Sequence, residues 1–552
     1  MIPQQKADRL SQPDFCWSYM ARPSFLRTVF NDALLTPEVL DHSYAGGGSV
    51  VDPFICEFVP NDPQNPQAWR ALRRWTICIA AAGTTFVVSF CSSTYTGAEA
   101  GLAAEFGVSE AIVNLGLALF LVGYIIGPLI WGPMSEVYGR RNLMIGTLAL
   151  LTAFNIGAAE ANDMPTLLVC RFLGSIFGSS PMTNAGGAVA DLFSAAERGV
   201  PVAVFAAGPF MGPVLGPIVG GFAGDYAGWR WVMRVMAIVS GVLWVLGTLL
   251  IPETYAPVIL ERRAKALEKA TGNIFRTRLQ MSGSRPTLAR SIRIALSRPW
   301  ALLCREPIVT IMSIYMALVY GTLYMMFGAF PIVYQKNRGW SAGEGGLAFL
   351  GLAVGIVVAI GLIIPDDVYR FKKIEREAIA RNELGAAPEA RLPPGIVGSV
   401  MMPISLFWFA WTNGPDDHYI VSIIASVPFG AGMLLVFFSL TQYLVDSYTI
   451  YAASVIAGSG IVRSLFGAAF PMFTTKMYED LGIHWASSVP AFLSLACVPF
   501  PLLFHRYGAR IRERCKYSRQ AAEALAKIKL HETVTASDSR DEAKLRQGPL
   551  EA

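Results

Sequence analysis

The sequence predicts an all-α polytopic membrane protein with twelve transmembrane helices, arranged as two pseudo-symmetric bundles of six. Composition is the first observation behind this prediction: 53% of the 552 residues are hydrophobic and 15% are charged, whereas soluble domains carry roughly 25% charged residues. The second is a mean hydropathy of +0.44. The third is a rhythm of six apolar runs, one long polar stretch and six more apolar runs. An ordinary cytosolic enzyme is therefore excluded, because its interior could not hide so much apolar side chain.

Each expected span holds about 20 mostly apolar residues, the length that crosses a bilayer. The first bundle occupies residues 74–251, with spans near 75–98, 110–131, 143–160, 165–189, 199–222 and 229–251. The second bundle occupies residues 306–506, with spans near 307–334, 347–365, 396–412, 420–443, 450–475 and 485–505. The boundary between the tenth and eleventh spans is the weakest, since only VDSYTIYAAS separates them.

Basic residues gather in alternate loops between these spans. Arg140 and Arg141 follow the second span, and residues 262–305 between the bundles are rich in Lys and Arg. The positive-inside rule then places both termini in the cytoplasm. We expect residues 1–73 to be a largely disordered cytoplasmic tail and residues 252–305 a partly helical cytoplasmic connector. Residues 507–552 are expected to form a second cytoplasmic tail.

Charge and cysteine patterns exclude several other functions. The net charge of +5 comes from loops between spans, so it sets topology and does not indicate a nucleic-acid partner. The eight cysteines show no CxxC or Cys/His spacing, so we expect no metal and no bound cofactor. No span carries a nucleophile–base pair, which argues against an enzyme.

The second span ends in the string GPMSEVYGRR, residues 132–141. Gly132 and Gly139 permit a tight turn there. Glu136 lies close in sequence to Arg140 and Arg141, so the loop can form an ion-pair latch between helices. An ordinary positive-inside loop accounts for the same residues equally well.

The fifth span contains the string GPFMGPVLGPIVGG, residues 208–221. Its glycines recur every four residues and so share one helix face, which lets a neighbouring helix approach closely. Its prolines remove backbone donors and bend the helix. The physical interpretation is a packing stripe with a hinge. The residues concerned are Gly208, Pro209, Gly212, Pro213, Gly216, Pro217, Gly220 and Gly221.

These strings resemble the signatures of the major facilitator superfamily, and the chain is similar to its fungal twelve-span drug–proton antiporters from about residue 62 to residue 512. The 132–141 string resembles the family's cytoplasmic gating loop, with Glu136 for the usual Asp. Asp191 resembles the acid that joins that gate. Many bacterial members carry Arg where this chain has Val137, so their full charge relay is not implied. The glycine–proline string is similar to the antiporter signature, and Arg171 resembles the fourth-helix arginine implicated in proton or substrate movement.

Two arginines, Arg171 and Arg463, are the charges expected deep within spans, where charge is costly and usually functional or paired. Snorkelling of Arg171 to the outer interface and bonding of Arg463 to backbone carbonyls are the alternatives. Tyr320, Tyr324 and Phe327 form one aromatic face, used for packing or for stacking on a flat ligand. The polar side chains expected to contact the substrate are Asn114, Asn155, Asn184 and Gln442, together with Ser89, Ser92 and Ser93 of the first span.

The resemblance implies a secondary active transporter that exports a toxin, antifungal drug or secondary metabolite by proton antiport with alternating access. A cavity with arginines and no central acid favours a small hydrophobic, neutral or anionic compound over a polyamine. The titratable candidates Glu136, Asp191 and Glu99 all lie near span ends, so coupling to the proton gradient is weakly supported. An importer or facilitator of an organic acid or nutrient is the alternative, and a membrane sensor is a third.

The partners we expect are this small-molecule substrate and the lipid bilayer, with no nucleic acid. We expect a monomer in the plasma membrane, with the vacuolar or another internal membrane as the alternative location.

Overall fold

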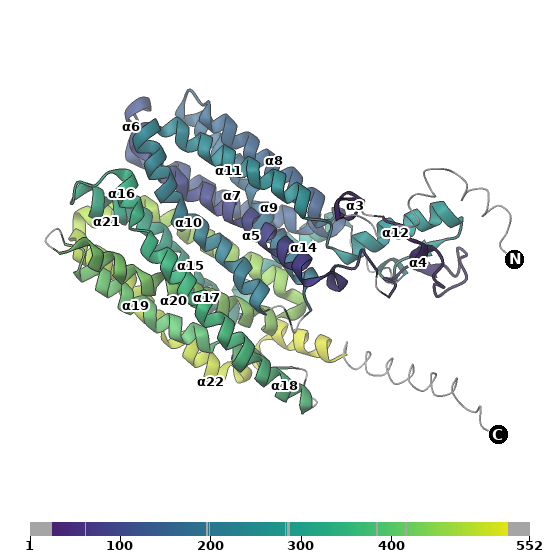
Figure 1. Ribbon diagram of the computed structural model, residues 1–552. Coiled ribbons are helices and arrows are strands. Elements are labelled where there is room, and N and C mark those ends of the chain that lie inside the picture. The colour runs from purple at the N-terminus through teal and green to yellow at the C-terminus, as the bar shows by residue number, and fades with distance from the viewer. Residues whose placement is uncertain are drawn as a thin grey trace, which may run out of the picture. The chain divides into compact units, whose positions relative to one another are not determined.

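The structure is a computed structural model that describes residues 25–527, apart from 32, 61, 195–196, 198, 282, 284–286, 382, 384 and 415–416. Almost all regular structure in this part of the chain is helical (Figure 1). The chain divides into two compact units. The first comprises residues 1–109, 126–216 and 226–295, and the second comprises 110–125, 217–225 and 296–552.

Long helices make up most of the first unit. Two of them, α7 and α10, continue into the second unit over residues 110–125 and 217–225. The long helices are α5 (Ala71–Ser93), α7 (Glu110–Tyr138), α8 (Arg140–Ala159), α9 (Met164–Leu192), α10 (Gly199–Ala227) and α11 (Trp229–Leu250), with η2 (Thr94–Ala98) and α6 (Glu99–Phe106) after α5.

The second unit repeats this pattern of long helices. Its elements are α15 (Pro307–Phe330), η3 (Pro331–Lys336), α16 (Ala342–Leu347), α17 (Leu350–Pro365), η4 (Asp366–Phe371), α18 (Lys372–Ala380), η5 (Pro388–Arg391), α19 (Pro393–Trp411), α20 (Tyr419–Ser447), η6 (Thr449–Tyr451), α21 (Ala452–Cys497) and α22 (Pro499–Arg514). A backbone break at Gly482, where φ is 71°, divides α21. The positive φ is one that glycine adopts without the steric cost of a side chain.

Local sequence explains several helix ends. The Asp163 side chain accepts a hydrogen bond from the Thr166 N–H and so caps α9. Ser341 and Glu344 form a capping box at the start of α16. Gly139, at φ 96°, makes the turn from α7 to α8. Prolines 128 and 133 lie inside α7 without ending it, as membrane helices tolerate when neighbouring groups satisfy the freed carbonyls.

Ten helices in the described residues are long and apolar enough to cross a membrane. The chain is thus a multi-pass membrane protein. Helix α9, expected as the fourth span, is not among the ten, and it carries Arg171 in a segment rich in Gly and Ser. The stretch Thr449–Arg514 counts as one candidate of 66 residues, although the expected eleventh and twelfth spans both lie within it.

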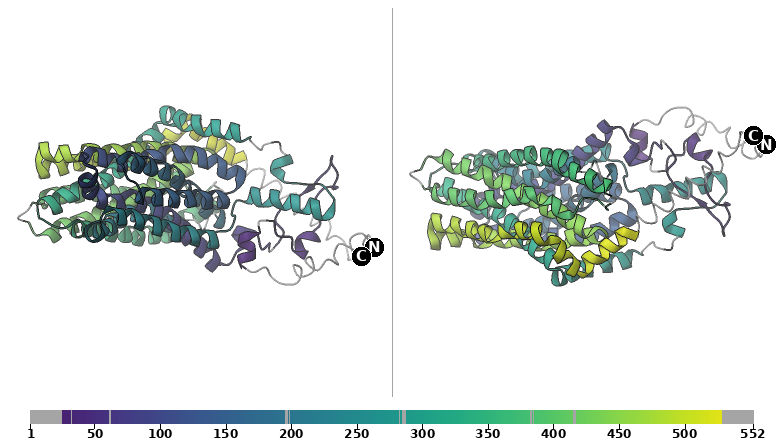
Figure 2. Two further views of the ribbon diagram at one scale, coloured as in Figure 1. Left: turned by 90° about the horizontal axis from the view of Figure 1, so that it is seen from above. Right: turned by 90° about the horizontal axis from the view of Figure 1, so that it is seen from below.

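The described part of the N-terminal segment is packed against the connector. Its elements are α3 (Phe25–Phe30), α4 (Pro37–Leu40), β1 (Phe54–Ile55) and η1 (Pro66–Ala68), and those of the connector are α12 (Ala256–Thr271), β2 (Phe275–Arg276), α13 (Arg278–Met281) and α14 (Leu288–Arg305). Strands β1 and β2 pair in parallel, with Phe54 opposite Phe275. In both views of Figure 2 the purple N-terminal helices lie beside teal connector helices.

This packing differs from the largely disordered tail expected for residues 1–73. The difference has a physical reason: scattered apolar residues of the segment share one small core with α12 and β2. That core comprises Val39, Cys56, Val59, Ala264, Leu267 and Phe275. The residues that pack together in this core lie about 200 positions apart in the sequence, so local composition does not reveal the contact. Residues 1–24 lie outside the described residues.

Candidate functional site

The turn between α7 and α8 holds a cluster of charged residues from the first unit. Arg140 opens α8, and its Nε lies 2.9 Å from Oδ2 of Asp191, the penultimate residue of α9. The Thr254 hydroxyl donates to the same carboxylate oxygen at 3.2 Å. The Arg140 guanidinium also lies 5.1 Å from the centre of the Tyr255 ring. The turn thereby ties α8 to the end of α9 and to the start of the connector.

Glu253, which was not among the residues predicted for this site, is the carboxylate at the centre of this turn. It is only 3% exposed. Its oxygens accept the backbone N–H groups of Arg140 at 3.1 Å and Arg141 at 3.3 Å. A side chain on Gly139 would place its Cβ 2.2 Å from the Glu253 carboxylate, so glycine is required there. In the sequence, the feature that could have indicated Glu253 is its place as an acid directly after the sixth apolar span. We call Gly139, Arg140, Asp191 and Glu253 the turn cluster.

The other residues expected at this loop lie at its edge. Arg141 is buried, and its side chain donates to the carbonyls of Ile251 at 2.9 Å and Thr248 at 3.2 Å. Within the described residues Glu136 forms no ion pair, and it lines a cavity of about 80 Å³ with Tyr255. Burial, together with the nearby Glu136 carboxylate, raises the pKa of Tyr255. A Cβ on Gly132 would meet only Thr183, at 3.6 Å.

The second unit contains a similar cluster that the sequence reasoning missed. Arg391, just before α19, lies 3.1 Å from Asp446 and 3.0 Å from Asp367. Asp446 is the penultimate residue of α20, as Asp191 is of α9. The pseudo-symmetry of the two bundles was the signal that could have found it. We call Arg391, Asp446 and Asp367 the second charge cluster.

Arg171 is buried inside the first unit, with 3% of its surface exposed. Its guanidinium donates to the carbonyls of Ser92 at 3.2 Å and Cys91 at 3.5 Å. It lies 4.0 Å from the centre of the Tyr95 ring, a cation–π contact. Asn155 donates to Cys91 Sγ at 3.5 Å and to Ser240 at 3.3 Å. These contacts of Arg171 come from α5 and η2, and Asn155 of α8 links Cys91 of α5 to Ser240 of α11.

Asn184 lies further along the same helix as Arg171 and is 1% exposed. Its amide nitrogen donates to Ser180 Oγ at 3.0 Å. Its backbone carbonyl accepts a hydrogen bond from Arg140 at 3.5 Å. Asn184 thus connects the polar interior of α9 to the turn cluster.

The glycine stripe of α10 packs directly on α5 in the first unit. A Cβ on Gly212 would lie 2.6 Å from the carbonyl of Phe86 and from the N–H of Phe90. A Cβ on Gly208 would lie 2.7 Å from the Ala82 carbonyl, and one on Gly216 would lie 1.9 Å from Ser93 Oγ. The helix stays continuous through Pro209, Pro213 and Pro217.

The stripe changes partner at its far end. Gly221 belongs to the part of α10 within the second unit. A Cβ there would lie 2.5 Å from the Ala342 carbonyl of α16, and Gly220 beside it is buried. One helix therefore carries close-packing glycines for two different neighbours.

The aromatic face of α15 is buried in the second unit. The Tyr320 hydroxyl donates to the Tyr324 hydroxyl at 3.2 Å. The Tyr324 and Phe327 rings lie 5.0 Å apart, edge to face. The Arg463 guanidinium lies 5.1 Å from the ring centres of both Tyr320 and Phe437. Gln442 on α20 is half-buried.

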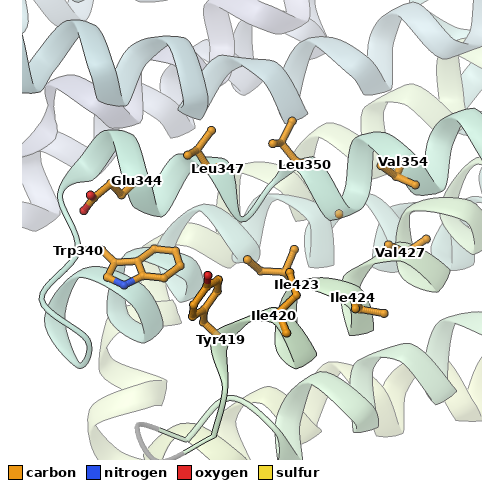
Figure 3. A pocket seen from close by; sticks show the side chains of 11 residues that line it. Trp340, Glu344, Leu347, Leu350, Val354, Tyr419, Ile420, Ile423, Ile424 and Val427 are labelled. Carbon is orange, nitrogen blue, oxygen red and sulfur yellow. The ribbon is translucent and has the colours of Figure 1, made fainter.

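A groove of about 780 Å³ runs between α16, α17 and α20 of the second unit (Figure 3). Its walls are aliphatic, with Trp340, Tyr419 and Glu344 at one end. Leu350 is 44% and Val354 52% exposed, so the groove opens sideways from the helices. Exposed apolar side chains on membrane helices face lipid. This groove therefore differs from the buried pathway residues around Arg171 and Tyr320.

Within the described residues, no group of three or more His, Cys, Asp or Glu side chains could hold a metal ion. These residues instead offer a buried arginine, Arg171, a half-buried arginine, Arg463, aromatic faces and charge clusters at helix ends. Long apolar helices with charges of this kind define a polytopic membrane transport protein.

The chain belongs to the major facilitator superfamily, whose family model matches residues 81–471. It is 52% identical over 502 residues to the MFS-type efflux pump MFS2 of Trichophyton rubrum, covering 91% of this chain and 84% of that protein. It is 48% identical over 524 residues to the multidrug transporter mdrA of Aspergillus fumigatus, covering 95% of this chain and 85% of that protein.

The fold also matches a solved transporter structure. The xylose transporter XylE from E. coli superposes with a TM-score of 0.56, at 17% sequence identity. The match covers 79% of this chain and 99% of XylE. At that identity the likeness shows a shared fold alone.

Proposed function

We propose that this protein is a secondary active exporter of a small hydrophobic organic compound, neutral or anionic, such as a toxin, antifungal drug or secondary metabolite. The observation that carries the proposal is the 52% identity, over 91% of the chain, to a protein named as an efflux pump. Proton antiport with alternating access is the proposed mechanism, and the proton gradient is the proposed driving force.

The proposed topology has twelve spans, with both termini in the cytoplasm and a plasma-membrane location. Ten helices qualify by length and composition. Counting α9 as a span, and dividing the 66-residue stretch at Gly482, brings the number to twelve. The protein acts as a monomer in this proposal, because one chain carries both bundles.

The proposed pathway residues come from both units. In the first unit they are Arg171 and Asn184, and in the second they are Tyr320, Tyr324, Phe327, Gln442 and Arg463. Each arginine contacts an aromatic ring. The spans that carry them, residues 165–189 and 450–475, contain no Asp, Glu or Lys in the sequence. A polycation would find no carboxylate there to replace its hydration shell, so a flat, hydrophobic compound suits these residues better.

The turn cluster and the second charge cluster are the proposed cytoplasmic gates of the two bundles. Each joins the start of one long helix to the end of the next through an arginine and an aspartate. Partly exposed ion pairs of this kind contribute about 0–1 kcal/mol. Contacts of that strength can form and break once per transport cycle.

Facilitated exit without proton coupling is the second candidate. One observation favours it: the acids among the proposed gating residues, Glu136 and Asp191, lie near helix ends and not midway along a span. A proton carrier needs a group that titrates and is exposed alternately to the two sides.

The test uses a host cell stripped of its own exporters. The protein is expressed there, and the accumulation of a panel of hydrophobic, anionic and polyamine compounds is compared with that in cells carrying an empty vector. We expect lower accumulation of at least one hydrophobic compound, and loss of that difference with a protonophore. Unchanged accumulation across the panel would contradict export. A difference that survives the protonophore would contradict antiport and support facilitated exit.

A further inference from the structure

The segment between Leu34 and Trp69 forms one small folded body with α12 and β2. We call this body the clamp domain, comprising residues 34–69 and 256–276. Strand β1 pairs with β2, and the shared core buries Val39, Cys56 and Leu267 almost completely. The Tyr44 hydroxyl donates to the Val39 carbonyl at 2.9 Å. In Figure 1, α4 and α12 lie together beyond one end of the long helices of the first unit.

A buried ion pair holds the two halves of the clamp domain together. Arg263 of α12 and Asp62 are both fully buried, with 0% of each side chain exposed. They bond through two nitrogens and two oxygens, and the Arg263 Nη2 to Asp62 Oδ1 distance is 2.9 Å. Gln64 accepts a further hydrogen bond from Arg263 at 2.9 Å. Asp62 also accepts the Gln64 N–H at 2.9 Å, so the pair is embedded in a hydrogen-bond network.

Such a pair adds little to the free energy of unfolding, because the cost of desolvating two charges offsets most of their attraction. Its main effect is to favour one arrangement of the two segments over others. Arg and carboxylate meet in one bidentate geometry, which fixes position and orientation. Removal of one partner leaves the other charge buried and uncompensated. The pair therefore holds residues 62–64 in one arrangement on α12.

That arrangement brings the N-terminal segment to Glu253 of the turn cluster. A cavity of about 10 Å³, too small for a ligand, lies where three parts of the first unit meet. Its lining residues are Thr28, Gln64 and Trp69 of the N-terminal segment, Glu253 after α11, and Ile259 of α12. Trp69 is held in turn by a hydrogen bond from its ring nitrogen to the Pro63 carbonyl at 2.8 Å. Phe30 adds a second contact, with its ring 5.0 Å from the Arg141 guanidinium.

We propose that Asp62 and Arg263 are positioning residues for transport, which seat the clamp domain against Glu253 and so fix the turn from which Arg140 reaches Asp191. The N-terminal segment is then a working part of the gate. The inference rests on the gating role proposed above for the turn cluster. Asp62 and Arg263 lie outside the proposed pathway, but through Glu253 they hold the backbone N–H groups of Arg140 and Arg141 in place.

The test compares Asp62→Ala and Arg263→Ala with Arg278→Ala. Arg278 pairs with Glu57 in the same region, but those side chains are 78% and 47% exposed, which makes Arg278→Ala the matched control. Arg263→Lys keeps the charge and loses the planar fork. It gives a milder variant if the alanine variants fail to reach the membrane. Peptide-resolved hydrogen–deuterium exchange then follows the amides of residues 139–141, two of which donate to Glu253.

We expect both alanine variants to raise exchange at residues 139–141 by about tenfold, because exchange follows the local opening equilibrium. Arg263→Lys should give an intermediate increase, and Arg278→Ala should leave exchange unchanged. The maximal export rate should fall in the same order, with the KM for the exported compound unchanged. Faster exchange confined to residues 54–64 would overturn the proposal and leave the pair a purely structural role. The exchange readout needs no substrate, so it stands even if the wild-type protein exports nothing.

Discussion

The buried cation Arg171 is the residue on which the proposed pathway depends most. Its carbonyl partners Cys91 and Ser92 and the ring of Tyr95 satisfy the guanidinium inside the first unit. That environment differs from snorkelling, because the side chain is 3% exposed. A cation held by neutral groups keeps a positive field in the interior, where water cannot screen it.

Arg171→Ala should leave the protein in the membrane and reduce export by about tenfold or more, since loss of about 1.4 kcal/mol from the transport step lowers its rate tenfold. Initial export rate per molecule at the membrane is the measurement. Arg234→Ala is the control, because Arg234 is 41% exposed and pairs with Glu160 at 3.0 Å. Normal export by Arg171→Ala would assign the arginine to packing.

Asp191→Asn should slow export by a few-fold without changing the apparent affinity, because its pair with Arg140 is partly exposed and contributes about 1 kcal/mol or less. Kinetics of export over a range of substrate concentrations measure both quantities. Glu160→Gln removes the more exposed ion pair with Arg234, and it should change neither the maximal rate nor the apparent affinity. An altered KM with an unchanged maximal rate would place Asp191 in the binding site and not at the gate.

Cysteine reactivity tests the packing of the clamp domain at the residue scale. Cys56 is 1% exposed, and burial raises the pKa of its thiol to about 11. The reactive thiolate is therefore scarce between pH 7 and 9, and the reagent has no access to it. Peptide-resolved maleimide labelling should leave Cys56 unmodified over that pH range, while exposed Cys304 reacts. Rapid labelling of Cys56 in the native protein would show that the clamp domain is open.

At the scale of the element, α10 is an unusually crowded helix. Its glycines let α5 approach so closely that a single methyl group at Gly212 would meet the backbone atoms of Phe86 and Phe90 on α5. The prolines do not break α10, as membrane helices tolerate proline when neighbouring groups satisfy the freed carbonyls. The stripe thus stabilises one helix pair and leaves the far end of α10 to a second neighbour.

Gly212→Ala should lower the thermal midpoint of the purified protein, since overpacking costs about 1–3 kcal/mol. Gly146→Ala in α8 is the matched control, because nothing lies within 4 Å of its Cβ. That change should be neutral or slightly stabilising, as alanine favours helix by about 1 kcal/mol over glycine. Thermal unfolding in detergent, followed by intrinsic fluorescence, compares the two. Equal midpoints would show that α5 and α10 are not in close contact.

Elements with a strong local signal were predictable from the sequence. Apolar length located most of the long helices, although α9 does not qualify as a span and the eleventh and twelfth expected spans fall within one candidate. The i, i+4 glycines identified a close-packing face. Contacts between distant segments were not predictable. Asp62 and Arg263 are 201 residues apart, and neither stands in an apolar run that would make its burial evident. Glu253 was visible as an acid after a span, but its partners are backbone N–H groups, which leave no trace in side-chain patterns.

At the scale of the whole molecule, the two units share a plan of long helices and helix-end charge clusters. Arg140 with Asp191 in one unit and Arg391 with Asp446 in the other repeat the same connection. Duplicated bundles with matching helix-end charge clusters are consistent with the alternating access proposed above. The charged fraction of 15% fits this plan, since the helices that are long and apolar enough to cross a membrane carry few charges.

Proton-coupled export can be measured in reconstituted proteoliposomes. The vesicles enclose a pH-sensitive dye, and a compound identified by the cellular assay is added outside while its uptake is measured. We expect compound movement with proton flux in the opposite direction, and loss of both in Arg171→Ala. Compound movement without any pH change would contradict antiport. No movement beyond that in protein-free vesicles would contradict transport itself.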